Sequence, residues 1–138
     1  MSRVINPNVL GKERDQLTKA IVLALREMAQ QTLSSQTYDL AAFVVLSLEA
    51  IAETIDPSVQ AWEKRGYWVK ADRFRMDWMW TGLYAKDLRI ALQTEDWGQV
   101  ALLSVKIGGK LNNIKIPVRH RIGQPWIGAW KKFSTSAP

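Results

Sequence analysis

The stretch YDLAAFVVLSLEAIAETI, residues 38–55, decides the expected fold of this 138-residue chain. Its apolar residues recur every three or four positions, which is typical of one face of an α-helix. These residues are Ala41, Val44, Val45, Leu48, Ile51, Ala52 and Ile55. Phe43 and Leu46 widen the stripe, so the first half of the helix is apolar nearly all round. Such a helix belongs in the interior of a helical bundle.

Helices are also expected on both sides of this segment. Residues 8–33 repeat apolar side chains at helical spacing and end at a polar break, SSQT, over residues 34–37. After residue 55, Asp56 and Pro57 are typical of a helix start, because the acid can cap the first turn and proline suits the first helical position. Gly66 then predicts the end of a short helix of about nine residues.

Residues 68–93, WVKADRFRMDWMWTGLYAKDLRIALQ, predict a long helix with two apolar faces. The first face holds Ala71, Phe74, Trp78, Gly82, Ala85 and Leu92, and the second holds Met76, Met79, Trp80, Leu83 and Ile90. Two apolar faces indicate contacts on two sides of the helix. We therefore expect Met76, Met79, Trp80 and Leu83 to be covered by a second helix of the same chain, or to be buried across a homodimer interface.

The last long helix is expected to begin near Thr94 or Asp96 and to end before Pro117. Beyond this proline, the turn sequences IGQP and IGAW predict an irregular, extended segment. The sequence thus predicts an all-α fold, an antiparallel bundle of four long helices and one short helix over residues 1–117. We expect the basic segment 118–138 to pack on this same domain.

Charge is unevenly distributed along the chain, whose net charge is +6. Residues 1–61 hold five Lys or Arg and seven Asp or Glu, whereas residues 62–138 hold fourteen and six. No acidic residue follows Asp96, and seven cationic residues stand from Lys106 onward. This asymmetry indicates either an anionic partner or a contact between the basic half and the chain's own acidic half.

The C-terminal segment combines cations with tryptophans and leaves three interpretations open. Its candidate binding residues are Arg119, His120, Arg121, Trp126, Trp130, Lys131 and Lys132. Cations can contact phosphates and Trp can stack on bases, which would make a nucleic-acid interface. The segment could instead bind a protein, or it could be a structural strap with Trp126 and Trp130 buried and its cations near the acidic half. We expect the strap, ordered to about Phe133.

Residue counts exclude several kinds of catalytic site. The chain has no cysteine, and His120 is its only histidine, so a thiol nucleophile and a di-iron site with two Glu-x-x-His motifs are both excluded. No phosphate-binding glycine loop is present. Glu49 and Glu53 lie one helical turn apart and could be joined by Glu27 and Asp77. We expect them to be solvated or paired with the nearby cations Lys70, Arg73 and Arg75.

The sequence favours a small cytoplasmic helical-bundle protein that is not an enzyme and acts by protein–protein interaction or assembly, with a homodimer among the expected partners. Nucleic-acid binding through the C-terminal segment is one alternative. Binding of a small ligand in a pocket between Trp78, Trp80 and the carboxylates is another. No catalytic residue, metal or cofactor is predicted. No membrane association is predicted, because the apolar run from Leu40 to Leu48 is too short to cross a bilayer.

Overall fold

The computed structural model describes residues 7–30 and 33–136, and within these ranges the chain forms seven α-helices and no strand. The helices are α1 Pro7–Ala29, α2 Ser35–Glu53, α3 Ile55–Lys64, α4 Trp68–Trp78, α5 Trp80–Gln93, α6 Trp97–Lys110 and α7 Ala129–Thr135. The prediction of an all-α fold is confirmed. Two details differ from the expectation. The long helix over residues 68–93 is divided at Met79, and the C-terminal segment contains a short helix, α7.

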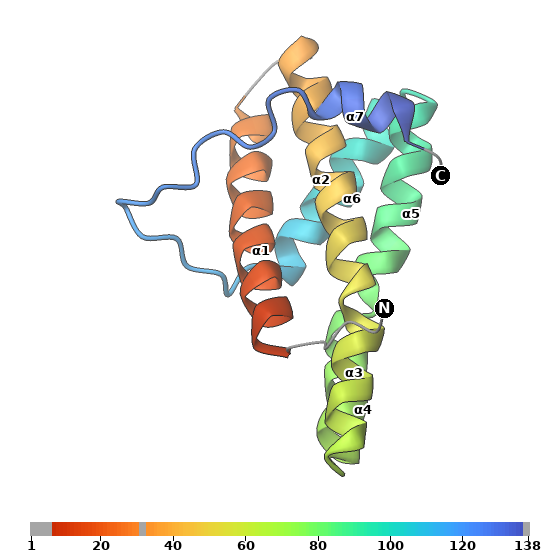
Figure 1. Ribbon diagram of the computed structural model, residues 1–138. Helices are drawn as coiled ribbons and strands as arrows, with labels where there is room; N and C mark the ends of the chain where they lie inside the picture. The colour runs from red at the N-terminus through yellow and green to blue at the C-terminus, as the bar shows by residue number, and fades with distance from the viewer. Residues whose placement is uncertain (1–6, 31–32, 137–138) are drawn as a thin grey trace.

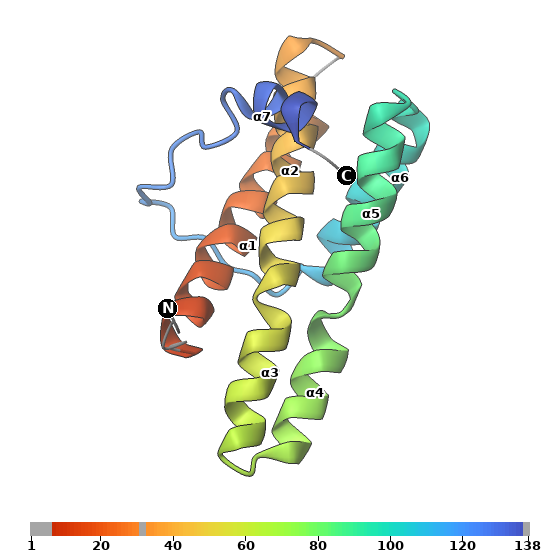
Figure 2. The ribbon, with the colours of Figure 1, turned by 45° about the vertical axis from the view of Figure 1, so that its right-hand side comes forward.

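Helices α1, α2, α5 and α6 form an up-and-down bundle, with α2 packed against α1, α5 and α7 (Figures 1 and 2). As expected for an interior helix, α2 buries most of its length. Its fully buried apolar side chains are Leu40, Ala41, Ala42, Val44, Val45, Leu48 and Ile51. Burial of this apolar area is the main force that holds the bundle together.

Helices α3 and α4 form a hairpin that extends beyond one end of the bundle (Figure 2). The chain passes from α2 into α3 at Thr54, whose hydroxyl donates to the carbonyl of Ile51 at 2.7 Å. The predicted stop at Gly66 is confirmed, since Gly66 adopts a φ of +80°, which a glycine reaches without strain. The hairpin therefore returns the chain to the bundle as α5.

The break between α4 and α5 is small. Met79 keeps a right-handed helical conformation, with φ −62° and ψ −23°, and its N–H still donates to the carbonyl of Arg75. The buried hydroxyl of Thr81 donates to the carbonyl of Trp78 at 2.7 Å, a bond that competes with the regular helical ladder. Helix α5 nevertheless continues in nearly the direction of α4 (Figure 2).

Candidate functional site

The side of α4 and α5 that faces away from the core carries an exposed apolar stripe, which we call the outer face. Its members are Val69, Met76, Met79, Leu83 and Ile90, each between 51% and 74% exposed. Seven positions separate Val69, Met76, Leu83 and Ile90 in turn, so these residues lie on one side of the helices. From Val69 to Ile90 the outer face is about 32 Å long at the helical rise per residue.

The opposite side of the same two helices packs on the core, as the sequence predicted for the first apolar face. Its buried residues are Ala71, Phe74, Thr81, Ala85, Leu88 and Leu92. Trp78 is half-buried against this core, but Gly82 is exposed. The core-facing side therefore fixes α4 and α5 in place without any contribution from the outer face.

The expectation that another helix of the same chain covers the second face is wrong for three of its four residues. Met76, Met79 and Leu83 are more than half exposed in the structure. Only Trp80 is partly buried, with its ring centroid 5.8 Å from that of Tyr84. The alternative, burial of these side chains between two molecules, stays a prediction.

A hollow of about 630 Å³ lies beside the outer face, between α2 and α5. Glu49, Glu53, Lys86 and Arg89 line it, so its charges of both signs largely balance. The sequence hypothesis placed a ligand pocket among carboxylates, Trp78 and Trp80. Neither tryptophan lines this hollow, and Glu49 is already paired with a cation, so the arrangement gives the ligand hypothesis no support.

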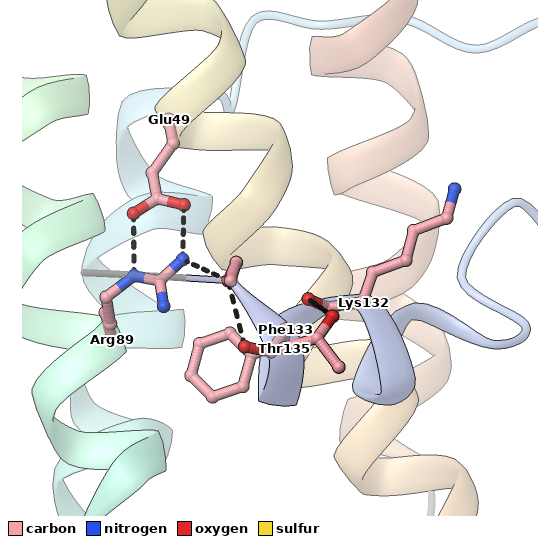
Figure 3. Close-up of polar contacts among 6 residues, drawn as sticks. Glu49, Arg89, Lys132, Phe133 and Thr135 are labelled. Atoms are coloured by element: carbon pink, nitrogen blue, oxygen red, sulfur yellow. Dashed lines mark hydrogen bonds and ion pairs between the residues drawn. The ribbon is translucent and has the colours of Figure 1, made fainter.

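The cation that pairs with Glu49 is Arg89, which the sequence hypothesis did not consider. Arg89 Nε and Nη2 donate to the two carboxylate oxygens of Glu49, both at 2.8 Å (Figure 3). Nη2 also donates to the Ser136 hydroxyl at 3.1 Å, and the guanidinium lies 4.7 Å from the Phe133 ring centroid. The hydrogen bonds to Glu49 raise the pKa of Arg89. This ion pair thus joins α2, α5 and the C-terminal segment.

A second buried cation, Arg14 of α1, has no carboxylate partner among the described ion pairs. Its Nη1 donates to the hydroxyls of Thr54 and Ser58, both at 3.0 Å, and its guanidinium lies 4.6 Å from the Phe74 ring centroid. Burial lowers the pKa of Arg14. Both buried arginines occupy core-facing positions in an apolar helical pattern, and this placement was the signal in the sequence that could have identified them.

Residues 126–136, which we call the strap, pack on the bundle and are helical from Ala129 to Thr135 where an extended chain was expected, whereas residues 118–125 are largely exposed. Trp126, Ala129 and Phe133 are buried, with Trp126 only 4% exposed, and α7 packs across α2 (Figure 1). Trp130 is half-buried, and its ring lies edge-on to Tyr38 at 4.8 Å between centroids. Trp126 is therefore not accessible for stacking on a base in this conformation.

At the start of α7 the strap is attached through its backbone rather than through its cations. The carboxylate of Asp39, near the start of α2, accepts the N–H of Trp130 at 2.9 Å and that of Gly128 at 3.3 Å. It thereby serves as the cap that α7 lacks in its own sequence, because the first N–H groups of a helix have no intrahelical partner. The expectation that the tail cations reach the acidic half is not met by any ion pair between described residues.

The predicted cationic cluster lies on the loop between α6 and α7, which passes outside α1 (Figure 1). Arg119, His120 and Arg121 are exposed, as are Lys131 and Lys132 on α7. His120 Nδ1 accepts the N–H of Ile122 at 3.3 Å. The loop and α1 enclose a hollow of about 640 Å³, lined by all three cluster residues. Among the residues that the structure describes, none forms an ion pair with Arg119 or Arg121.

The described ranges contain neither a metal-binding cluster nor a membrane-spanning helix. No three His, Asp or Glu side chains are placed to hold a metal ion, so Glu27 and Asp77 do not join Glu49 and Glu53 in such a group. No described helix combines the length and the apolar character needed to cross a membrane.

Comparison of the chain with protein-family models, with curated proteins and with solved structures found no match. The outer face, the loop cations and the contacts around them are therefore the features from which a function can be inferred.

Proposed function

We propose that this protein acts by protein–protein assembly through the outer face of α4 and α5. The observation that supports this proposal is the row of five exposed apolar side chains, with Met76, Met79 and Leu83 neighbouring one another at its centre, on helices whose opposite side already packs on the core. Scattered exposed apolar residues are ordinary on a protein surface, but several exposed apolar residues gathered on one side of a helix are typical of an interaction site.

The composition of the row also suits a binding surface. Met76 and Met79 lie at its centre, and the unbranched methionine side chain adapts its shape to a partner. Leu83 follows one turn later and is 61% exposed. A helix that presents anchors at this spacing can pack against the apolar side of another helix, with side chains of each filling the gaps of the other.

The proposal can be tested by light scattering and sedimentation over a range of protein concentrations. We expect the wild-type chain to associate, and a Met76→Asp/Leu83→Asp variant to be monomeric with an unchanged helical circular-dichroism spectrum. The matched control is Val105→Asp on α6, which changes an equally exposed apolar residue outside the outer face, at 74% exposure. A wild-type chain that stays monomeric, or dissociation by the Val105 variant alone, would contradict the proposal.

Nucleic-acid binding is a second candidate function, supported by a separate observation. The loop cations Arg119 and Arg121 are exposed, form no ion pair with another described residue, and lie beside the exposed His120. Such unpaired cations can replace the counterions of a phosphate backbone. With Trp126 in the core, this candidate depends on phosphate contacts from the loop rather than on base stacking.

Its test is the salt dependence of binding to a single-stranded and a double-stranded oligonucleotide. Each phosphate contact contributes roughly 0.7 to 0.9 to the slope of log affinity against log salt, so an Arg119→Gln/Arg121→Gln variant should flatten the slope by about 1.4 to 1.8. Lys64→Gln/Arg65→Gln removes the same charge from the far end of α3 and should leave the slope unchanged. Absence of binding at low salt would eliminate this candidate.

A further inference from the structure

We infer that the partner of the outer face is a second copy of this chain, packed antiparallel across a two-fold axis close to Met79. This inference rests on the proposed function and adds the identity and direction of the partner. The supporting observation is the placement of the charged residues within and beside the apolar row. These residues stand at nearly equal distances on either side of Met79 and have opposite signs.

Two charged residues of opposite sign interrupt the row at equal distances from its centre. Asp72 stands seven positions before Met79 and Lys86 seven positions after it, so both share its side of the helix. When a second copy is turned end to end about Met79, Asp72 lies opposite the partner's Lys86. The two-fold axis repeats this pair at the other end of the contact, because an isologous interface uses each contact twice.

The charged residues next to Asp72 and Lys86 also meet residues of opposite sign in the antiparallel arrangement. Arg73 stands six positions before Met79, and Asp87 stands eight positions after it. Each directly follows one of the two charged residues of the row, Asp72 or Lys86. In the antiparallel arrangement Arg73 lies opposite the partner's Asp87. Four ion pairs of complementary sign therefore flank the apolar centre of the dimer.

The apolar residues also meet apolar residues in this register. Met76 lies three positions before Met79 and Leu83 four positions after it, so Met76 faces the partner's Leu83. At the ends of the row, Val69 and Ile90 are likewise ten and eleven positions from the centre. The half-buried Trp80 follows Met79 directly, which places it beside the axis, next to its own copy.

A parallel dimer of the same face would set like charges against each other. Asp72 would face the partner's Asp72, and Lys86 the partner's Lys86. Opposed like charges penalise one arrangement relative to another and are a common source of specificity in helix pairing. The charged residues thus favour the antiparallel direction, and the apolar row favours association itself.

Both charged side chains at the row are exposed and can reach a partner. Within the described ranges Asp72 pairs with Arg75 of its own helix, at 3.2 Å, and its side chain is 76% exposed. Such an exposed pair contributes little and does not prevent a second partner. Lys86 forms no ion pair within the described ranges. The α3–α4 hairpin projects beyond the bundle, so a second copy can lie alongside α4 and α5 over the length of the row (Figure 2).

Cysteine crosslinking tests the direction directly, because the natural chain has no cysteine. A disulfide needs the two Cβ atoms to lie about 3.5–4.5 Å apart. We expect Met79→Cys to give a disulfide-linked dimer on mild oxidation. Asp72→Cys alone should not, because the two copies of this position would be about 21 Å apart along the antiparallel helices. An oxidised mixture of Asp72→Cys and Lys86→Cys chains should give the mixed dimer, with Val105→Cys as the control for random collisions.

Charge reversal provides a second measurement. Asp72→Lys should weaken association roughly tenfold, since it converts two attractive contacts of the dimer into repulsive ones. Adding Lys86→Asp to the same chain should restore association, because the pairs re-form with exchanged signs. Circular dichroism of each variant verifies that the fold is intact.

The outcomes separate this inference from the proposed function. If the chain associates, is dissociated by Met76→Asp/Leu83→Asp and yet crosslinks through Asp72→Cys alone, the outer face is an interface and the antiparallel direction is wrong. The same conclusion holds if the second charge reversal fails to rescue the first. If the wild-type chain does not associate at all, both the proposed function and this inference fail.

Discussion

Two regions of this protein look alike in sequence and behave in opposite ways in the structure. The outer face of α4 and α5 and the C-terminal strap, residues 126–136, both mix large apolar residues with cations. In the strap, Trp126 and Phe133 lie in the core. On the outer face, Met76 and Leu83 point to solvent. Apolar composition alone therefore does not determine whether a segment serves folding or binding.

The two regions differ in the contacts that the rest of the chain makes with them. The strap crosses α2 and is held by specific polar contacts, the Asp39 carboxylate at its helix start and Arg89 at its end. No helix of the described chain covers the outer face, and its side chains have no such attachment. The strap thus contributes to the stability of the monomer, while the outer face contributes nothing to it and remains available for a partner.

The largest expected difference between the two regions is in the stability lost when a large side chain of each is truncated to alanine. Trp126→Ala should lower the free energy of unfolding by about 3–5 kcal/mol, because it removes buried area and leaves a cavity. Met76→Ala, at 73% exposure, should change it by no more than about 0.5 kcal/mol. Denaturant unfolding at a protein concentration too low for association measures both. Equal losses would contradict the distinction between the regions.

The next effect concerns the ion pair that attaches the strap to the bundle. Glu49→Ala should destabilise the protein by about 1.5–3 kcal/mol, because it removes two hydrogen bonds to a charged group and leaves the Arg89 guanidinium buried with the Ser136 hydroxyl as its remaining partner. The control, Asp15→Ala, breaks the surface pair with Lys19 and should cost at most about 1 kcal/mol. A Glu49 variant as stable as the control would show that the pair does not hold the strap.

A smaller effect is expected at the start of α7. Asp39→Ala removes the acceptor of two backbone N–H groups and should cost about 1 kcal/mol, as the loss of a helix cap does. Asp39→Asn keeps one side-chain oxygen and should cost less. Hydrogen exchange at the Gly128 and Trp130 amides should become faster in the alanine variant. Unchanged exchange would mean that Asp39 does not anchor the strap.

The smallest effect is expected at Gly82 and has the opposite sign. A Cβ at this position would meet the Cβ of Ala52 at 3.7 Å, an ordinary contact, so the position has room for an alanine side chain. Gly82→Ala should therefore stabilise the protein by about 0.4–1 kcal/mol, because the unfolded chain loses freedom. A loss of stability would indicate a tighter approach of α5 to α2 than these distances describe.

The sequence alone was sufficient for the helical class and for most of the helix order. The 3.6-residue period of the apolar residues identified α2 as the interior helix, and Gly66 marked the end of α3, because these signals depend only on local geometry. The sequence also identified Met76, Met79 and Leu83 as belonging to a second apolar face. Periodicity assigns side chains to a face with good accuracy because the backbone of a helix fixes their directions.

Tertiary structure decided what each face meets. The partner of Glu49 is Arg89, forty residues away, and the partner of the α7 N–H groups is Asp39, about ninety residues away. No local pattern encodes such distances, because they depend on how the helices pack around α2. For the same reason the sequence left open whether the tryptophans of the strap or the residues of the outer face would be covered. Only the arrangement of the helices shows that α2 receives the strap and that the outer face remains exposed.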